Sequence, residues 1–339
     1  MIFEFRAPDA CVGMMLGHSV SLASQRLRKG HWLTEADVEA LVQAGVSDVF
    51  AGQLEDGDVL EDDAAQQIAK HAAGAHIAFE KPHTGRCNLI AKEDGVITYE
   101  RDRLIALNAI DAKITLAMVP PLSTVRANDL VGTVKIIPFA VPGEALAACT
   151  ELLATHGPLS TINPFLGARC ALLETRLSAV KPLSEKILGF TQERAQRVGL
   201  VMDGVEACDH RPGPVADWIK AKAASIGPQG VLLIFGASAT VDEADVIPAA
   251  IQRAGGTVER VGMAADPGNL LVFGKVGQAT VIGLPGCAKS PALNGFDWVL
   301  ERVAANIAIT PQDWAEMSVG GLLKEIEARP QLRRPVPKA

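Results

Sequence analysis

Residues 231–245 read VLLIFGASATVDEAD, and this stretch decides the fold that the sequence predicts. Residues 231–235 are all apolar and have the length of a strand that is covered on both faces. The small residues after them form a turn, and residues 244–254 have the pattern of a helix that ends at Gly255-Gly256. A buried strand that passes through a short turn into a helix is typical of a parallel α/β sheet.

Strands and helices alternate on both sides of this stretch. Strands are expected at residues 171–175, 199–205, 258–263, 270–273 and 280–283. Helices are expected at residues 184–197, 215–225 and 291–305. This alternation predicts a doubly wound, mostly parallel sheet, in which ligands bind beyond the carboxyl ends of the strands.

Two segments that follow strands of this sheet carry residues suited to an anion. In the first, Gly236 and its small neighbours precede a helix, whose backbone N–H groups can face a phosphate. In the second, Pro285 and Gly286 form a tight turn that leads to Lys289 and Ser290. Lys289 has two interpretations, a cation that meets the anion or a solvated surface lysine.

Cys287 lies in the second of these turns. A helix N-terminus lowers the pKa of a thiol, so an activated nucleophile is one interpretation of this residue. No histidine is near it in the sequence to act as a base, and we therefore favour a space-filling thiol.

Taken together, the two segments resemble the molybdopterin-binding domain shared by molybdopterin adenylyltransferases and molybdopterin molybdenumtransferases. The resemblance covers residues 170–309, and its most specific part is DPGNLLVFGK at residues 266–275 followed by GLPG at residues 283–286. The chain is also similar to the molybdopterin-binding half of bacterial proteins that fuse this domain to a molybdenum-cofactor cytidylyltransferase. The cytidylyltransferase half is absent from this sequence. Residues 27–52 are similar to the region that precedes the domain in molybdenumtransferases.

The resemblance implies a three-layer α/β fold that binds molybdopterin, with Mg²⁺ as a further candidate ligand. If the protein is an enzyme, the implied activity is of the adenylyltransferase or molybdenumtransferase type. Asp242 or Asp245 would then orient the phosphate or hold the divalent metal; the other interpretation of Asp245 is a helix N-terminal carboxylate stabilised by the dipole. The implied cofactor-binding residues are Gly236, Ala237, Ser238, Thr240, Pro267, Gly268, Gly283, Pro285, Gly286, Lys289 and Ser290.

The sequence also departs from the family's pattern. Ala237, Ala239 and Val241 stand where the family loop has glycines, and Asp266 and Asn269 stand where molybdenumtransferases have lysines. Alanine tolerates a positive φ poorly, so we expect a loop that does not close on a phosphate in the family's way.

The predicted function is therefore molybdopterin binding in molybdenum cofactor biosynthesis, without full catalytic activity. Two alternatives stay open. One is a non-enzymatic carrier or regulator that serves a separate cytidylyltransferase or a molybdoenzyme maturation partner. The other is a pyrophosphatase-like, nucleotide-processing relative of the same fold.

The first half of the chain has a different character. Residues 1–82 predict a small α+β region, in which Thr34 and Asp37 form a capping-box pattern. Residues 83–160 predict a β-rich barrel or sandwich, because short strands recur around turns. Residues 168–310 are the predicted α/β domain, and residues 311–339 are a C-terminal extension.

Composition excludes several classes of protein. A formal net charge of −7 and an aromatic content of 4% weigh against nucleic-acid binding. No apolar run reaches the ~18 residues of a membrane span, and Glu4, Arg6 and Asp9 stand where a signal peptide needs an apolar core. The six cysteines contain no CxxC pair, so no metal site is expected. We expect a cytoplasmic homo-oligomer.

Overall fold

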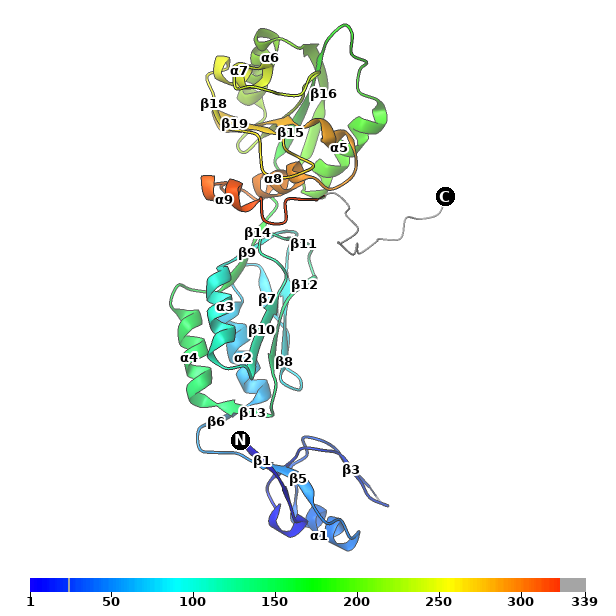
Figure 1. Cartoon of the computed structure of the whole chain (residues 1–339), viewed down its shortest axis with the longest axis vertical. Helices are drawn as coiled ribbons and strands as arrows, with labels where there is room; N and C mark the ends of the chain where they lie inside the picture. Colours follow the sequence, from blue (N-terminus) through cyan, green and yellow to red (C-terminus); the bar gives the residue numbers. More distant parts are fainter. Residues whose placement is uncertain (24, 324–339) are drawn as a thin grey trace. The chain divides into compact units, whose positions relative to one another are not determined.

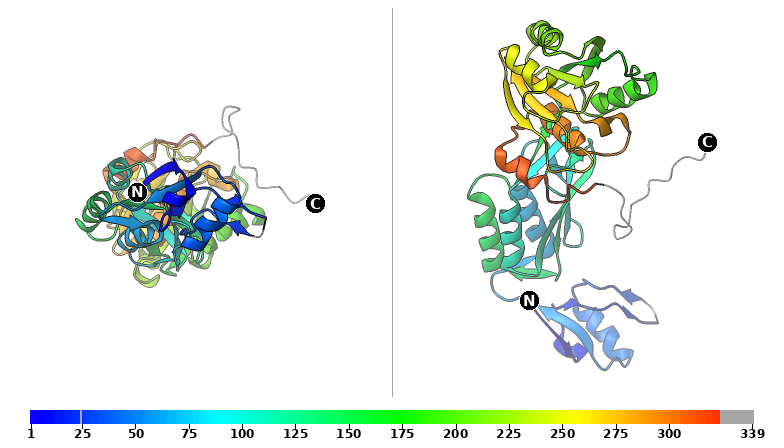
Figure 2. Two further views of the ribbon diagram at one scale, coloured as in Figure 1. Left: turned by 90° about the horizontal axis from the view of Figure 1, so that it is seen from below. Right: turned by 45° about the horizontal axis from the view of Figure 1, so that its top comes forward.

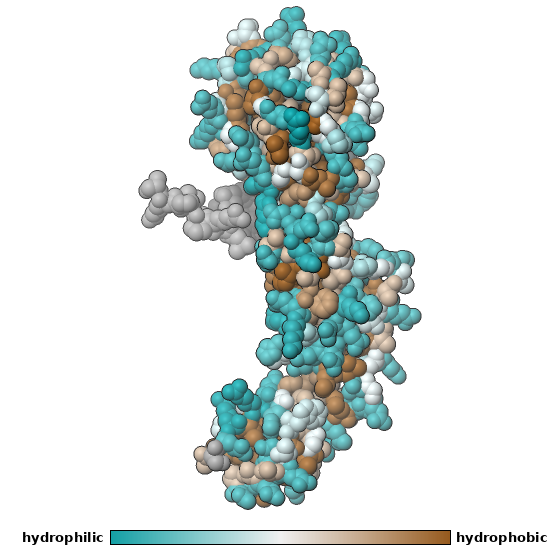
Figure 3. All heavy atoms as spheres, turned by 180° about the vertical axis from the view of Figure 1, so that it is seen from behind, coloured by the Kyte–Doolittle hydropathy of each residue, from teal (hydrophilic) through white to brown (hydrophobic). Residues whose placement is uncertain are grey.

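The computed structural model describes residues 1–23 and 25–323, which are drawn in colour in Figure 1. Its contacts divide the chain into two compact units, Met1–Ile162 and Asn163–Ala339. Each unit has its own hydrophobic core, and hydrophilic side chains cover much of the face seen in Figure 3. Among the described residues, none of the helices combines the length and the apolar character that crossing a membrane requires.

Unit 1 begins with a small α+β lobe. Its elements are β1 (Ile2–Arg6), a 3-10 turn (Pro8–Ala10), β2 (Met15–Leu16), β3 (Val20–Ser21), β4 (Arg26–Leu27), α1 (Glu35–Gln43) and β5 (Val49–Gln53). β1 and β2 pair antiparallel with β5. The predicted capping box opens α1, because the Thr34 hydroxyl oxygen accepts a hydrogen bond from the Asp37 backbone N–H.

The rest of unit 1 is a layer of helices on an antiparallel sheet. Its elements are β6 (Asp58–Leu60), α2 (Glu61–Ala72), β7 (Ile77–Phe79), β8 (Arg86–Ala91), β9 (Gly95–Tyr99), α3 (Arg101–Ile110), β10 (Ile114–Met118), β11 (Thr124–Val125), β12 (Leu130–Ile136), β13 (Ala140–Pro142), α4 (Gly143–Ala154) and β14 (Ser160–Pro164). Four strands form a sheet in the order β10-β12-β8-β7. α2, α3 and α4 lie on one side of it, where they share its core (Figure 2).

The sequence predicts a β-rich barrel or sandwich for residues 83–160, and the structure has two sheets in this region, one of four strands and one of three in the order β11-β9-β14. In the part of the chain that the structure describes, the four-stranded sheet is open, and β10 and β7 are its edges. Alternate residues of β8 are buried, as a strand with one covered face requires. The helices cover that face, so the sheet has no need to close on itself.

Unit 2 is a mixed α/β unit built on a six-stranded sheet. Its elements are β15 (Arg169–Arg176), α5 (Glu185–Arg197), β16 (Val201–Asp209), α6 (Pro212–Ser225), β17 (Val231–Phe235), α7 (Val246–Arg253), β18 (Thr257–Val261), β19 (Val272–Val276), β20 (Ala279–Leu284), a 3-10 turn (Gly286–Lys289), α8 (Gly295–Ala304) and α9 (Pro311–Glu316). The strand order is β16-β15-β17-β20-β19-β18. Only β19 runs against its neighbours, so the sheet is mostly parallel, as the sequence predicts.

Helices cover both faces of this sheet. Along β17, Val231, Leu233 and Phe235 pack on one face with α5 and α8. Leu232 and Ile234 pack on the other face with α6 and α7. This double burial explains why the deciding stretch is continuously apolar rather than alternating.

The described residues after 310 belong to the same core. Trp314 of α9 is buried, and its ring centroid lies 5.4 Å from that of Phe273. Beyond α9, the Gly321 carbonyl oxygen accepts a hydrogen bond from the Asp266 N–H, and the Leu323 N–H donates to the Asp266 carbonyl oxygen. These two hydrogen bonds hold residues 321–323 against the connection between β18 and β19.

Candidate functional site

The candidate site lies at the carboxyl edge of the sheet of unit 2. β16, β15, β17 and β20 are parallel, so all four end at this edge. The connection between β18 and β19 also returns here, because β19 is antiparallel to β20 and begins with Val272 opposite Gly283. Both predicted ligand-binding segments therefore start from the same edge.

The loop that follows β17 closes without a left-handed residue. Neither Ala237 nor Ala239 has a positive φ, so the steric objection to alanine at these positions does not arise. Gly236 is required for another reason, since a Cβ there would lie 2.5 Å from the Ser238 carbonyl oxygen. Ser238 is exposed at the tip of this loop, whereas Thr240 is buried.

The two aspartates of this loop bind its own backbone. Asp245 is the N-cap of α7, and its carboxylate accepts hydrogen bonds from the N–H groups of Val246 at 2.6 Å and Val241 at 3.0 Å. The Asp242 carboxylate accepts one from Ala244 N–H at 2.7 Å. Both side chains therefore hold the loop in shape, and their catalytic role stays a prediction.

A hydroxyl that the sequence analysis missed joins three strand ends. Thr175, at the end of β15, is buried, and its Oγ1 accepts a hydrogen bond from Ala237 N–H at 2.9 Å. The same oxygen lies 3.2 Å from the Phe235 carbonyl oxygen and 2.7 Å from Nδ1 of His210. A neutral His210 that carries its hydrogen on Nδ1 satisfies every group, since Thr175 then donates to Phe235 and accepts twice.

Thr175→Val is expected to lower the free energy of unfolding of unit 2 by about 1–3 kcal/mol, because it leaves buried backbone groups without a partner. Urea unfolding followed by tryptophan fluorescence measures this, since Trp218, Trp298 and Trp314 all lie in unit 2. Thr175→Ser keeps the hydroxyl and should lower the free energy of unfolding by less than Thr175→Val does. Equal stability of the valine variant and the wild type would contradict the assigned network.

His210 follows β16 at the carboxyl edge of the sheet, close enough to Asp245 to feel its charge. Burial lowers the pKa of its imidazole below 6.5, and the negative charge of Asp245 opposes part of that shift. A lowered pKa agrees with the neutral tautomer that the Thr175 network requires.

The pKa of His210 predicts how stability depends on pH. Because the native pKa lies below 6.5, the unfolded chain binds more protons than the native one as the pH falls through that value. His210 therefore makes unit 2 less stable on acidification, and its contribution is restored above 6.5. His210→Gln should flatten this part of the curve of unfolding free energy against pH. An unchanged slope would show that His210 is not the group responsible.

A shallow hollow with a volume of about 10 Å³, room for about one water molecule, lies between the loops after β15, β17 and β20. Its lining residues are Glu174, Thr175, Arg176, Val180, Lys181, Leu183, Phe235, Gly236, Ala237 and Lys289.

The charges around this hollow favour an anion. Arg176, Lys181 and Lys289 bring three positive charges, against the single carboxylate of Glu174. Glu174 is buried, and it pairs with Arg176 at 2.9 Å and accepts a hydrogen bond from Leu183 N–H. It thus fixes the loop after β15 and offsets only one of the three cations.

A buried ion pair that the sequence analysis also missed holds the turn after β20. Arg194 of α5 donates to Asp297 of α8 at 2.7 Å, and both side chains are 3% exposed. Three of the four remaining guanidinium hydrogens go to the carbonyl oxygens of Ala288, Ser290 and Ala292. Arg194 therefore fixes the backbone on both sides of Lys289, at Ala288 and at Ser290.

The predicted residues Pro267 and Gly268 adjoin this turn. The Pro267 carbonyl oxygen accepts a hydrogen bond from Gly295 N–H, and the Gly268 N–H points to the thiol of Cys287. Burial raises the pKa of that thiol, and the Gly268 N–H lowers it by a smaller amount. The raised pKa agrees with a space-filling thiol.

The structure thus brings part of the predicted set together. Gly236, Ala237 and Lys289 share the hollow. Gly283 is different, because it is buried inside the sheet, where a Cβ would lie 2.9 Å from Cβ of Val272.

A metal ion would need several nitrogen, sulfur or oxygen ligands in one place. Within residues 1–23 and 25–323, no group of three or more His, Cys, Asp or Glu side chains could hold one. The hydrogen bonds of Asp242 and Asp245 to the loop backbone give Mg²⁺ no prepared pair of carboxylates.

Comparisons with known proteins give little beyond this geometry. Residues 8–53 match a family model described as a domain of unknown function (DUF8806). No curated protein matches the chain. One similar solved structure is "The Crystal Structure of molybdopterin biosynthesis moea protein from Pyrococcus horikosii", with 14% identity and a TM-score of 0.31, over 90% of this chain and 75% of that one. A likeness of this degree does not extend to function.

Proposed function

We propose that unit 2 binds molybdopterin, or a closely related phosphorylated pterin, at the carboxyl edge of its sheet. The observation that carries the proposal is the cationic hollow, in which Arg176, Lys181 and Lys289 surround the Gly236-Ala237 backbone. Helices on both faces of the sheet support the three-layer fold that the sequence resemblance implies.

The size of the hollow limits what it can hold. Pockets for whole small molecules usually measure about 300–1,000 Å³, whereas the volume of this hollow is only about 10 Å³, so it would take a single phosphate oxygen while the rest of the phosphate lies over its opening. The rest of the ligand would extend along the edge toward Gly286 and Ser290, which are exposed. Asp245 caps α7, so the lysine and arginine side chains, rather than the N-terminus of α7, would neutralise the phosphate.

The proposed role is binding without appreciable group transfer. Asp242 and Asp245 are the acids with which the resemblance would orient a phosphate or a metal, and both bind the loop backbone. This observation favours the carrier or regulator, which would pass the ligand to a separate cytidylyltransferase or to a molybdoenzyme maturation partner. A pyrophosphatase-like activity would need the same acids, so the same observation weighs against it.

The test is to incubate the full-length protein with molybdopterin, Mg²⁺ and each of ATP, CTP and molybdate, and to assay bound pterin and products. We expect bound pterin, no nucleotidyl product and no inserted molybdenum. Turnover on the order of 1 s⁻¹, which is ordinary for an enzyme, would contradict the carrier role. Absence of bound pterin in every mixture would contradict the function as a whole.

A further inference from the structure

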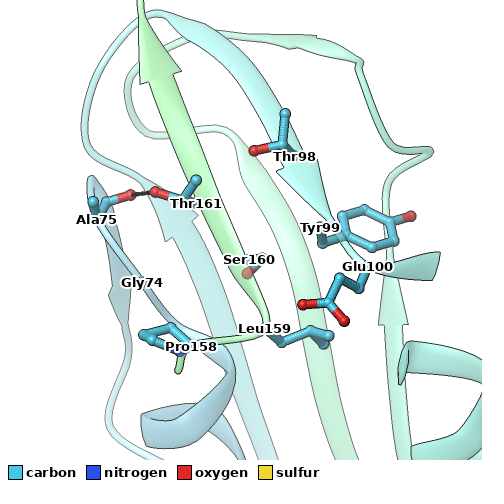
Figure 4. A pocket seen from close by; sticks show the side chains of 9 residues that line it. All are labelled: Gly74, Ala75, Thr98, Tyr99, Glu100, Pro158, Leu159, Ser160 and Thr161. Atoms are coloured by element: carbon cyan, nitrogen blue, oxygen red, sulfur yellow. Dashed lines mark hydrogen bonds between the residues drawn. The ribbon is translucent and has the colours of Figure 1, made fainter. Parts of the chain in front are cut away.

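A separate pocket opens in unit 1, between the end of β9 and the start of β14. Its volume is about 560 Å³, and it is lined by Gly74, Ala75, Thr98, Tyr99, Glu100, Pro158, Leu159, Ser160 and Thr161. Figure 4 shows the Glu100 carboxylate turned toward Leu159 and Ser160, where β14 begins. The volume lies in the range of small-molecule sites.

A buried guanidinium lies behind the wall of this pocket. Arg103 is 6% exposed; its Nη2 donates to the Pro158 carbonyl oxygen at 2.8 Å, and its Nη1 is 3.8 Å from Oε1 of Glu100. Pro158 and Glu100 both line the pocket; Arg103 itself does not, and Glu100 is the lining side chain that stands next to its Nη1. Nε and Nη1 have no hydrogen-bond partner among the residues that the structure describes. A buried cation with two unused donors requires an anion or a polar partner.

The N-terminus of α3 adds to the positive electrostatic field that Arg103 creates near this pocket. Glu100 is the N-cap of this ten-residue helix, and its side chain makes no capping hydrogen bond. The first-turn N–H groups therefore lack a side-chain acceptor, and the positive end of the helix dipole lies beside the pocket. Asp102 in the first turn opposes this field, as does Glu100 itself.

We propose that this pocket binds the carboxylate or the phosphate of a small molecule, with Arg103 as the partner of the anion. Glu100 is more than half exposed, so its carboxylate can turn to water and yield Nη1 of Arg103 to the ligand. The hydroxyls of Ser160 and Thr161 donate to backbone carbonyl oxygens and keep lone pairs that accept hydrogen bonds. The rest of the ligand would therefore carry hydroxyl or amino donors. This site is independent of the one proposed in unit 2.

The test uses full-length ¹⁵N-labelled protein titrated with inorganic phosphate and, separately, with acetate, at constant ionic strength kept with chloride. The resonances followed are Arg103 Nε–H and the backbone N–H groups of Gly74 and Ser160. We expect saturable shifts with at least one anion, and the anion that saturates first identifies the class. Lys289→Gln in unit 2 should leave these shifts unchanged, which separates the two sites.

Two variants give opposite expectations. Arg103→Met should abolish the saturable shifts. Glu100→Gln removes the competing carboxylate and should tighten binding by about two- to fivefold, the worth of an exposed ion pair. The proposal is overturned if neither anion gives saturable shifts in the wild type, or if Glu100→Gln binds no more tightly. Should Arg103→Met fail to fold by circular dichroism, the Glu100→Gln comparison alone decides.

Discussion

Arg194→Met is expected to lower the free energy of unfolding of unit 2 by about 3–5 kcal/mol, the usual result of removing one partner of a buried ion pair. The substitution leaves the Asp297 carboxylate, 3% exposed, without the donor 2.7 Å away. It also removes the hydrogen bonds to the carbonyl oxygens of Ala288, Ser290 and Ala292. The segment that carries Lys289 would lose its anchor, so ligand affinity should fall together with stability.

Arg197 provides the matched control. Its Nη2 is 3.4 Å from the same Asp297 oxygen, but its side chain is 58% exposed. Arg197→Met should therefore cost less than about 1 kcal/mol. The double variant Arg194→Met, Asp297→Asn should recover part of the loss, since it removes the buried carboxylate charge that has lost its buried partner. Similar costs for Arg194→Met and Arg197→Met in urea unfolding would show that burial does not set the strength of this pair.

Gly268→Ala is expected to destabilise unit 2 by at least about 2 kcal/mol, through backbone strain and overpacking together. Gly268 has a φ of +139°, a region that L side chains rarely adopt. A Cβ there would also lie 2.9 Å from the backbone nitrogen of Gly295 and 3.0 Å from its Cα, at the start of α8. Backbone atoms cannot move aside as a side chain can. The connection between β18 and β19, which carries Gly268, would therefore have to move away from the start of α8.

Gly286→Ala is the comparison for this change. No atom lies within 4 Å of a Cβ built at Gly286, and its φ is not positive. Its stability should stay within ~0.5 kcal/mol of the wild type. Any loss of ligand affinity in this variant would then report close approach of the ligand rather than damage to the fold. Equal unfolding midpoints for the two alanine variants would contradict the packing described for Gly268.

Residues 231–245 show how much of the fold can be predicted from the local sequence. Val231–Phe235 forms a strand with the predicted bounds, because its continuous apolar character reflects burial on both faces. Asp245 has the helix-capping position that a carboxylate before an apolar helix suggests. The mostly parallel order of the sheet also follows from the alternation of strands and helices.

The residues that the analysis missed depend on contacts between distant segments. Arg194 looks like a solvated helix cation until α5 and α8 are packed together, and its partner Asp297 is far along the chain. Thr175 joins Ala237 and His210 only because β15 lies between β16 and β17. In the first half of the chain, alternation specifies one buried face of the strands and leaves open whether helices or another sheet cover it, so the sequence could not place α2, α3 and α4 on the four-stranded sheet.

The central claim is that the cationic hollow of unit 2 holds the phosphate of a pterin ligand. The most direct measurement compares the affinity of the full-length protein for a stable oxidised derivative of molybdopterin with and without its phosphate. We predict that the phosphorylated form binds at least about tenfold more tightly at low salt, and that the difference shrinks as ionic strength rises. Lys289→Gln should weaken binding of the phosphorylated form alone. Equal affinity for the two forms, or binding of neither, would contradict the claim.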